Sequence, residues 1–202
     1  MEQVSTDRLA DVREGYTRTA KWLHWSIAVL ILGAYCSIYY REWLTDVLAH
    51  DRIAIQLHYS CGITVALLVI VRIGWRWRHA PPPPSAGSHF HRRAIGAGHL
   101  ALYAAMIVMP VTGFLSVADF VSKGKGHIDF WFVFKLDFLT GAEPFDRFGL
   151  PLALFEDPAH RIHAFAGAWI VWLLIAGHAA AAFYHQRVKR DGTLDRMTFH
   201  RR

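Results

Sequence analysis

The stretch "HAFAGAWIVWLLIAGH", residues 163–178, has a histidine at each end and no charged residue among the fourteen between them. A segment this apolar approaches the roughly 20 residues that a helix needs to cross the hydrocarbon core of a bilayer. Histidine is costly at such depth, so it normally faces the protein interior and has a partner there. The stretch therefore predicts a membrane helix with a functional imidazole at either end.

Four segments of the chain are long and apolar enough to span a membrane. They cover about residues 22–40, 53–75, 97–118 and 162–184. The 202-residue chain is 53% hydrophobic, which is high for a soluble domain and leaves little sequence for a second domain. The connections are short enough for consecutive helices to run antiparallel. We therefore expect a single all-α membrane domain over residues 1–202, an integral membrane four-helix up-down bundle, with tails at 1–21 and 185–202.

Basic residues are unevenly placed along the chain. Four Lys or Arg precede the first segment, five lie around the connection from the second to the third, and six follow the fourth, against seven on the opposite side. Because loops rich in Lys and Arg stay inside, we expect both termini of this multi-pass membrane protein in the cytoplasm. The net charge of +6 flanks lipid-embedded helices, so lipid headgroups are the expected partner and nucleic acid is not.

The connections between the segments carry further expectations. The four prolines of "HAPPPPSAGSHFHRR" predict an extended spacer, and Pro110 with Gly113 predicts a kink. "IDFWFVFKL", residues 128–136, is too short to span and is expected to lie at the membrane interface. The fourth helix is expected to begin after "EDPAH", with Asp157 as cap and Pro158 in the first helical position. Two cysteines, each inside a predicted helix, are expected to be buried thiols.

The histidines within the segments fall at two depths. Five of the 13 histidines lie there: His24, His58, His99, His163 and His178. Any one alone is explained by a hydrogen bond to a neighbouring helix. As a set, His24 and His178 lie at one level, near the side of the membrane that holds both chain termini, and His58 and His163 lie at another level. The fifteen residues from His163 to His178 separate them by roughly 22 Å with a residual rotation of roughly 60°, so both face broadly the same way.

Two facing imidazoles suit an iron porphyrin better than a zinc ion. Zinc prefers four N, S or O ligands, and no cysteine or carboxylate accompanies these pairs. Haem iron with both axial positions filled has no open site for oxygen and transfers electrons. No C-x-x-C-H occurs, so the interior haem sites would hold two haem b without thioether links. Arg72 and Arg76, four residues apart, would pair with propionates, or would instead snorkel to headgroups.

The sequence also resembles a known family, the bacterial cytochrome b561 proteins, and within it the superoxide oxidase type. The resemblance runs from about residue 16 to 197. It is carried by "KWLHW", by "LHYSCGI" with "VRIGWR", by "GHLALYAAMIVMPVTG" and by "GHAAAAFYHQRVKRDGTLDRM". It implies a diheme four-helix electron carrier, multi-pass in the bacterial inner membrane, that exchanges electrons with ubiquinone and, in the named type, takes them from superoxide on the periplasmic side. It further implies that His24 and His178 ligate the cytoplasmic haem, and His58 with a helix-four histidine the periplasmic haem.

The family pattern separates the two helix-four ligands by fourteen residues, which would fall on Ala164 here. His163 is one residue off, so we expect either a bulge in the helix or a compensating tilt of the rings. His160, eighteen residues from His178, faces the same way but lies roughly 27 Å from it, almost outside the hydrocarbon. We therefore prefer His163 over His160.

Residues outside the histidine pairs are assigned to the substrates. We expect Lys123, Lys125 and Lys135, with His127, to form a basic entrance for the superoxide anion, although acidic residues share this connection. The resemblance places a quinone-side histidine at His185, which would donate a proton to ubiquinone or would simply lie at headgroup level. His99 would serve the quinone, a propionate or helix packing.

The leading functional hypothesis is an oxidoreductase that moves single electrons from periplasmic superoxide to ubiquinone through two b haems. One alternative is a haem subunit that passes quinol electrons to a separate redox protein. A second alternative, from another class, is a non-catalytic haem-binding membrane protein.

Overall fold

The computed structural model describes residues 15–44, 48–79, 82, 89–136, 141 and 148–199. Three helices and a segmented fourth rod make up most of this part of the chain. They are α2 (Arg18–Leu44), α3 (Leu48–Arg78), α4 (His89–Ser122) and a rod of α5 (Ala153–Phe165), η2 (Ala166–Val171), α6 (Trp172–Tyr184) and η3 (His185–Lys189). Each of the four rods is long and apolar enough to cross a membrane. The predicted all-α four-helix bundle is confirmed.

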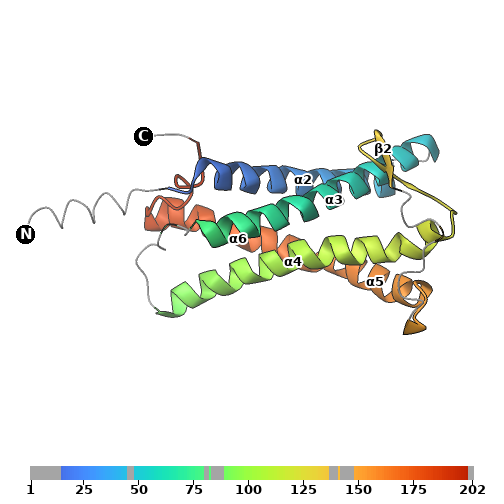
Figure 1. Ribbon diagram of the computed structural model, residues 1–202. Coiled ribbons are helices and arrows are strands. Elements are labelled where there is room, and N and C mark those ends of the chain that lie inside the picture. The colour runs from blue at the N-terminus through green and yellow to red at the C-terminus, as the bar shows by residue number, and fades with distance from the viewer. Residues whose placement is uncertain are drawn as a thin grey trace, which may run out of the picture.

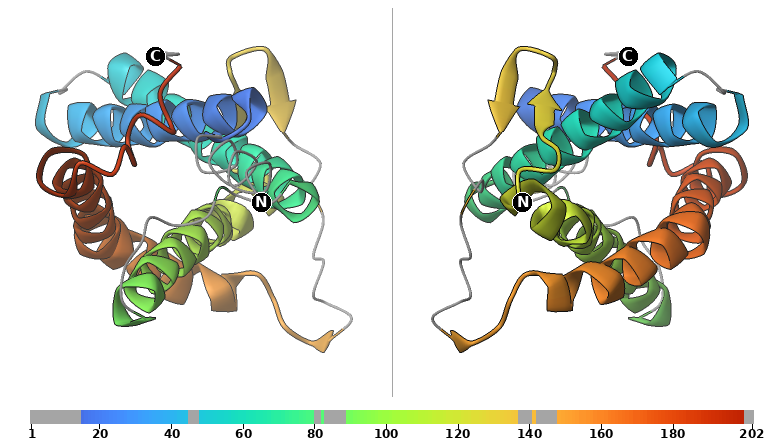
Figure 2. Two further views of the ribbon diagram at one scale, coloured as in Figure 1. Left: turned by 90° about the vertical axis from the view of Figure 1, so that its left-hand side faces the viewer. Right: turned by 90° about the vertical axis from the view of Figure 1, so that its right-hand side faces the viewer.

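The four rods run up and down along one axis (Figure 1) and surround it when seen end-on (Figure 2). The first and last described segments meet at one end, where the Tyr16 N–H donates to the Arg196 carbonyl oxygen over 3.2 Å. We call this the terminal end. A small hairpin of β1 (Ile128–Phe130) and β2 (Phe134–Leu136) lies toward the opposite end, called the hairpin end. Each helix extends beyond its predicted apolar segment, because helical structure continues past the hydrocarbon into the polar flanks.

The tightly buried core is small. Ile27 of α2 packs with Val65 and Val69 of α3, and partly buried residues of α4 cover them. Most other large apolar side chains face outward, such as Ile70 at 69% exposure and Leu173 at 74%. Lipid tails are as apolar as leucine, so this outward face is stable in a bilayer and needs no protein cover. Cys61 is buried as expected, whereas Cys36 is exposed on the outside of the bundle, and both thiols are free.

The fourth rod begins earlier than predicted. Its first helical residue is Ala153, and Asp157 does not cap it: the N-cap position is Leu152, and no side chain caps the helix. Pro158 lies inside α5 rather than in the first position. Leu152 is buried at 2% exposure, and the first turn closes through Leu154 and Phe155 amides donating to the carbonyls of residues 151 and 152. Because Leu152 is buried, the helix begins about one turn before the predicted start. Pro158 then lacks the backbone N–H that any other residue would donate within the helix.

A π-helical segment interrupts the fourth rod between its two histidines. η2 covers Ala166–Val171, so the stretch contains the bulge that was one of two expected accommodations. A π turn accommodates one extra residue and disturbs the regular pairing of backbone carbonyls. Here the Tyr35 hydroxyl of α2 donates to the Gly167 carbonyl oxygen over 2.7 Å. The bulge therefore reduces the fifteen-residue separation to the equivalent of fourteen.

Three expectations concern the connections between the helices and the interior of α4. The segment 128–136, expected at the interface, forms the β1–β2 hairpin, with Asp129 opposite Lys135. The proline spacer lies largely outside the described residues, as do most of residues 1–21 and the last three residues. α4 contains Pro110 as expected, and the kink there stays a prediction.

Candidate functional site

The terminal end of the bundle brings three histidines together. The ring centre of His24, from α2, lies 6.1 Å from that of His178, from α6. The ring of His99, from α4, lies 5.6 Å from His178 on another side. The His99 Nδ1–H donates to the Ile95 carbonyl one turn back, at 2.9 Å. All three rings are partly buried inside the bundle. Sequence reasoning grouped the first two and left the position of His99 open.

The hairpin-end pair consists of His58, from α3, and His163, from α5. Their ring centres lie 5.9 Å apart with an interplanar angle of 84°. The Nδ1–H of His58 donates to the Ala34 carbonyl and that of His163 to the Met109 carbonyl, each over 2.9 Å. A metal-bound imidazole usually donates its second nitrogen in this way, which fixes the tautomer and leaves Nε2 for the metal. His160 is exposed, and it is His163 whose ring meets His58.

Both separations fit an axial pair on one iron. A metal–imidazole bond of about 2.0 Å, with about 1.15 Å more to each ring centre, puts two such rings about 6.3 Å apart. The observed 6.1 Å for His24–His178 and 5.9 Å for His58–His163 lie close to this value. No cluster of three or more His, Cys, Asp or Glu with the geometry of an all-protein metal site occurs among the described residues. The donor set therefore fits haem and does not favour zinc.

Gly113 makes room for His163. A Cβ atom at this position of α4 would lie 2.8 Å from Cε1 and 3.1 Å from Nδ1 of the His163 ring. Only glycine therefore allows α4 to approach the ring this closely while Met109 accepts its hydrogen bond. The sequence motif "PVTG" suggested a kink and gave no sign of this second role.

Arg72 lies beside the terminal-end histidines. Its Nε donates to the Tyr103 hydroxyl over 3.1 Å, and its Nη1 donates over 3.5 Å to the carbonyl of Ala20, one helical turn before His24. Arg76 is exposed on α3, one turn closer to the terminal end. Both arginines are thus at the end where propionates were expected.

His185 is buried at the terminal end, between a histidine ring of α4 and a carboxylate of the C-terminal turn. It is 7% exposed, its ring stacks on His91 of α4 at 5.0 Å, and its Nδ1–H donates to the Asp191 carboxylate. The other Asp191 oxygen accepts the Thr193 amide at 3.1 Å. The left-handed conformations of Arg190 and Gly192, φ 54° and 71°, turn the chain back so that Asp191 faces the histidine. Sequence reasoning missed His91 and Asp191; the turn-forming "RDGT" was the available signal.

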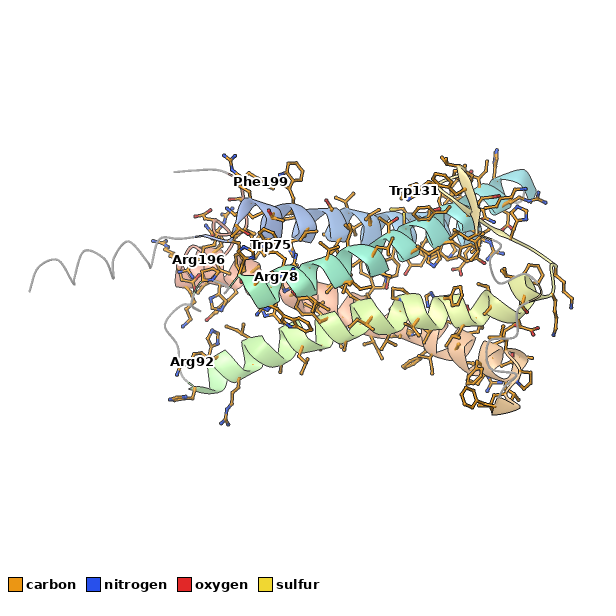
Figure 3. The ribbon with its side chains drawn as sticks, in the orientation of Figure 1. Trp75, Arg78, Arg92, Trp131, Arg196 and Phe199 are labelled. Carbon is orange, nitrogen blue, oxygen red and sulfur yellow. The ribbon has the colours of Figure 1, made fainter. Side chains whose placement is uncertain are left out.

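The three lysines do not form one uncompensated patch. Lys123 pairs with Asp119 at 2.7 Å, while Lys125 and Lys135 are exposed at the hairpin end. His127, expected in the same entrance, pairs with Asp129 at 3.0 Å. Acidic residues therefore offset part of the positive charge, as their shared connection suggested. Figure 3 shows the side chains along the bundle, with arginines labelled at the terminal end.

Four antiparallel apolar helices that bring imidazoles together in pairs at two levels are the arrangement expected of a membrane-embedded cytochrome of the b type. The sequence profile of the prokaryotic cytochrome b561 family matches residues 15–200, and the chain belongs to that family. Membership implies b-type haem, a role in electron transport as an oxidoreductase, and a multi-pass place in the inner membrane.

Three curated relatives are similar over almost their whole length. Cytochrome b561 homolog 2 of Escherichia coli is 29% identical over 91% of this chain and 91% of its own. Cytochrome b561 homolog 1 of the same organism is 24% identical over 90% and 96%. A probable superoxide oxidase, CybB, of Yersinia pestis is 28% identical over 87% and 90%.

Proposed function

We propose that this protein is a diheme oxidoreductase that takes single electrons from superoxide at the hairpin end and delivers them to ubiquinone at the terminal end. The observation that carries the proposal is the presence of two imidazole pairs at different depths of one bundle, each spaced for one iron. The superoxide assignment is supported by the name of the Yersinia pestis relative. The arginine excess at the terminal end supports a cytoplasmic position for both termini.

We assign His58 and His163 to the hairpin-end haem, and His24 and His178 to the terminal-end haem. A haem b held between the two histidines of either pair would carry one electron and would leave no open site for oxygen. The two levels are about 21 Å apart along the fourth rod, counting fourteen α-helical steps. Arg72, with Arg76, would neutralise propionates at the terminal end.

His99 is the competing partner for His178, since its ring is also close. The 6.1 Å separation of His24 from His178 is nearer to the axial value than the 5.6 Å of His99. We therefore assign His99 to the edge of the site. His24→Ala should lose the terminal-end haem, whereas His99→Ala should retain it with an altered spectrum or potential.

His185 would supply protons to the quinone. Reduction of ubiquinone to ubiquinol takes two electrons and two protons, and the electrons come from two superoxide ions, each oxidised to O₂. An imidazolium at His185 would give up its Nε2 proton to one quinone oxygen and keep its Nδ1–H on Asp191, and water would supply the second proton. A carboxylate that orients a histidine and stabilises its charged form is a familiar acid–base arrangement.

At the opposite end, Lys125 and Lys135 would raise the local concentration of the superoxide anion. Lys123 contributes less, because Asp119 holds it in an ion pair. Removal of the two exposed charges should lower the bimolecular rate with superoxide and weaken its dependence on salt.

Stopped-flow mixing of the purified protein with superoxide tests the proposal. We expect rapid appearance of the reduced b-type spectrum, followed by reoxidation when a soluble ubiquinone is added. Slow or absent reduction would remove the superoxide assignment. Reduction by quinol together with a co-purifying redox protein would indicate the alternative haem subunit. A pyridine haemochrome assay should give two haems per chain; a single, easily lost haem would favour a non-catalytic binding protein.

A further inference from the structure

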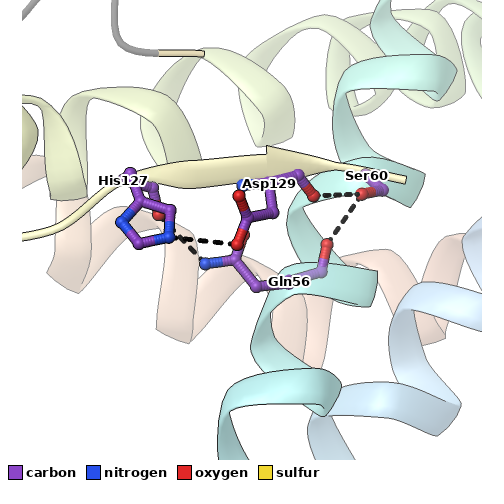
Figure 4. Close-up of polar contacts among 4 residues, drawn as sticks. All are labelled: Gln56, Ser60, His127 and Asp129. Carbon is purple, nitrogen blue, oxygen red and sulfur yellow. Dashed lines mark hydrogen bonds and ion pairs between the residues drawn. The ribbon is translucent and has the colours of Figure 1, made fainter. Parts of the chain in front are cut away.

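The β1 strand is attached edge-on to α3 by hydrogen bonds between its backbone and helix side chains (Figure 4). Gln56 donates to the His127 carbonyl at 3.0 Å and accepts the Asp129 amide at 2.7 Å. The Ser60 hydroxyl lies 3.3 Å from the Asp129 carbonyl and accepts the Trp131 amide at 2.8 Å. This pattern resembles strand pairing, with a helix in the place of the second strand.

The two elements match in repeat. Alternate residues of a strand are about 6.6 Å apart, and residues four apart on a helix are about 6.0 Å apart. Backbone groups of residues 127 and 129 therefore meet Gln56, and those of residues 129 and 131 meet Ser60 one helical turn further along. One turn further along α3, the contact is made by a side chain: the Trp131 indole N–H donates to the Thr64 hydroxyl at 3.0 Å. The polar stripe of α3 is thus covered, with Ser60 fully buried.

These contacts give the depth of the hairpin. Arg52 is the last charged residue on α3 before its apolar segment. Counting along the helix from Arg52, Gln56 lies about 6 Å, Ser60 about 12 Å and Thr64 about 18 Å further in. The headgroup zone of one leaflet is only about 5–7 Å thick. The turn at Trp131 is bound to Ser60 and Thr64, so it lies beyond this zone, and Figure 3 places Trp131 alongside α3, inward of the helix end.

The chemistry of the hairpin changes along the same direction. Its base carries the His127–Asp129 ion pair and Lys135. Its tip, residues 131–134, has no charge, and its four side chains are 38%, 52%, 71% and 63% exposed in the order Trp131, Phe132, Val133, Phe134. An uncharged tip with this exposure is unfavourable in water and favourable among acyl chains.

The tip is also held in a demanding backbone conformation. Trp131 and Phe132 have φ of 49° and 59°, a left-handed region that large side chains rarely adopt. The hydrogen bonds from the Trp131 amide and indole to α3 maintain this turn. The turn directs its large side chains outward while its backbone stays bonded to the helix.

We propose that residues 127–136 form a membrane wedge, with the tip 131–134 among the acyl chains of the leaflet at the hairpin end and the base at headgroup level. The molecules that contact the exposed tip are phospholipids. Lys135 extends its ammonium group to the headgroups from this position. The wedge attaches the long connection between α4 and α5 to the helix that carries His58.

Spin-label accessibility at Val133 tests the wedge. The label is placed on Val133→Cys in a Cys36→Ala, Cys61→Ala background, in phospholipid proteoliposomes and in native membrane vesicles. Leu67→Cys, 54% exposed on α3 within the span, is the lipid reference, and Glu42→Cys, exposed at the hairpin end of α2, is the aqueous reference. Haem content equal to that of the parent shows that each variant is folded.

The label at 133 should be accessible to oxygen and shielded from a water-soluble nickel chelate, as the label at 67 is. Nickel accessibility equal to that at Glu42→Cys would place the tip in water and overturn the proposal. Shielding from both reagents that appears only in native vesicles would mean that a protein covers the tip, which would equally overturn it.

Discussion

Under the proposed diheme assignment, replacement of Gly113 by alanine should displace one haem and spare the other. The added methyl group would lie 2.8 Å from Cε1 of the His163 ring, whereas carbon atoms pack at about 3.5–4.0 Å. The ring must therefore move by about 0.7 Å or more, and a ligand constellation tolerates only about 0.5 Å. The movement also lengthens the 2.9 Å hydrogen bond from Nδ1 to the Met109 carbonyl.

The expected loss follows from the cost of overpacking. Extra carbon in a well-packed interior costs about 1–3 kcal/mol. That corresponds to a roughly fivefold to 150-fold weaker affinity for the hairpin-end haem. The terminal-end histidines are on a different level and are untouched by the new methyl group.

Haem stoichiometry and a spectroelectrochemical titration provide the assay. Gly113→Ala should purify with fewer than two haems per chain, or with one redox component shifted, while the other keeps its spectrum and potential. Gly62→Ala is the matched control, since it lies four residues from His58 and its Cβ would meet nothing within 4 Å. Two haems with parental spectra and potentials in Gly113→Ala would refute the role given to this glycine.

Three further sets of sequence changes test the assignments. His163→Ala should lose the hairpin-end haem and His160→Ala should keep both in a haemochrome assay; the reverse result would exchange the ligands. Deletion of Ala168 should convert the π segment to regular helix and retain both haems, whereas insertion of one alanine there should lose the hairpin-end haem; a loss on deletion would contradict the bulge argument. Asp191→Asn should slow quinone-driven reoxidation in stopped flow by about tenfold or more, part of the roughly 10²–10⁴ that positioned acid–base groups supply, and should leave reduction by superoxide unchanged. An unchanged reoxidation rate would show that Asp191 does not orient the proton donor.

The sequence predicted those features that depend on periodicity and depth. Apolar length located the four spans, and counting residues along antiparallel helices brought His24 to His178 and His58 to His163. The extra residue between His163 and His178 also predicted a local accommodation, and the structure contains the π segment there.

Other features depend on contacts between distant segments, which periodicity does not encode. The close approach of Gly113 to His163 and the docking of β1 on Gln56 and Ser60 are of this kind. The start of α5 was predicted wrongly because the cap and proline signals at residues 157 and 158 are local, whereas burial of Leu152 is not. Local signals fail where a tertiary contact supplies more free energy than a cap does.

The shortest hydrogen bonds of the hairpin-end histidines, each 2.9 Å long, both go to main-chain carbonyls, those of Ala34 and Met109. Every residue type provides such a carbonyl, so substitution of either side chain leaves the hydrogen bond in place. The residue types at positions 34 and 109 can therefore change during evolution, while the helix backbone keeps the two imidazole rings in the same orientation. Comparing homologues position by position would therefore overlook this support, and only changes that move the backbone itself, such as insertions or a lost glycine, would expose it.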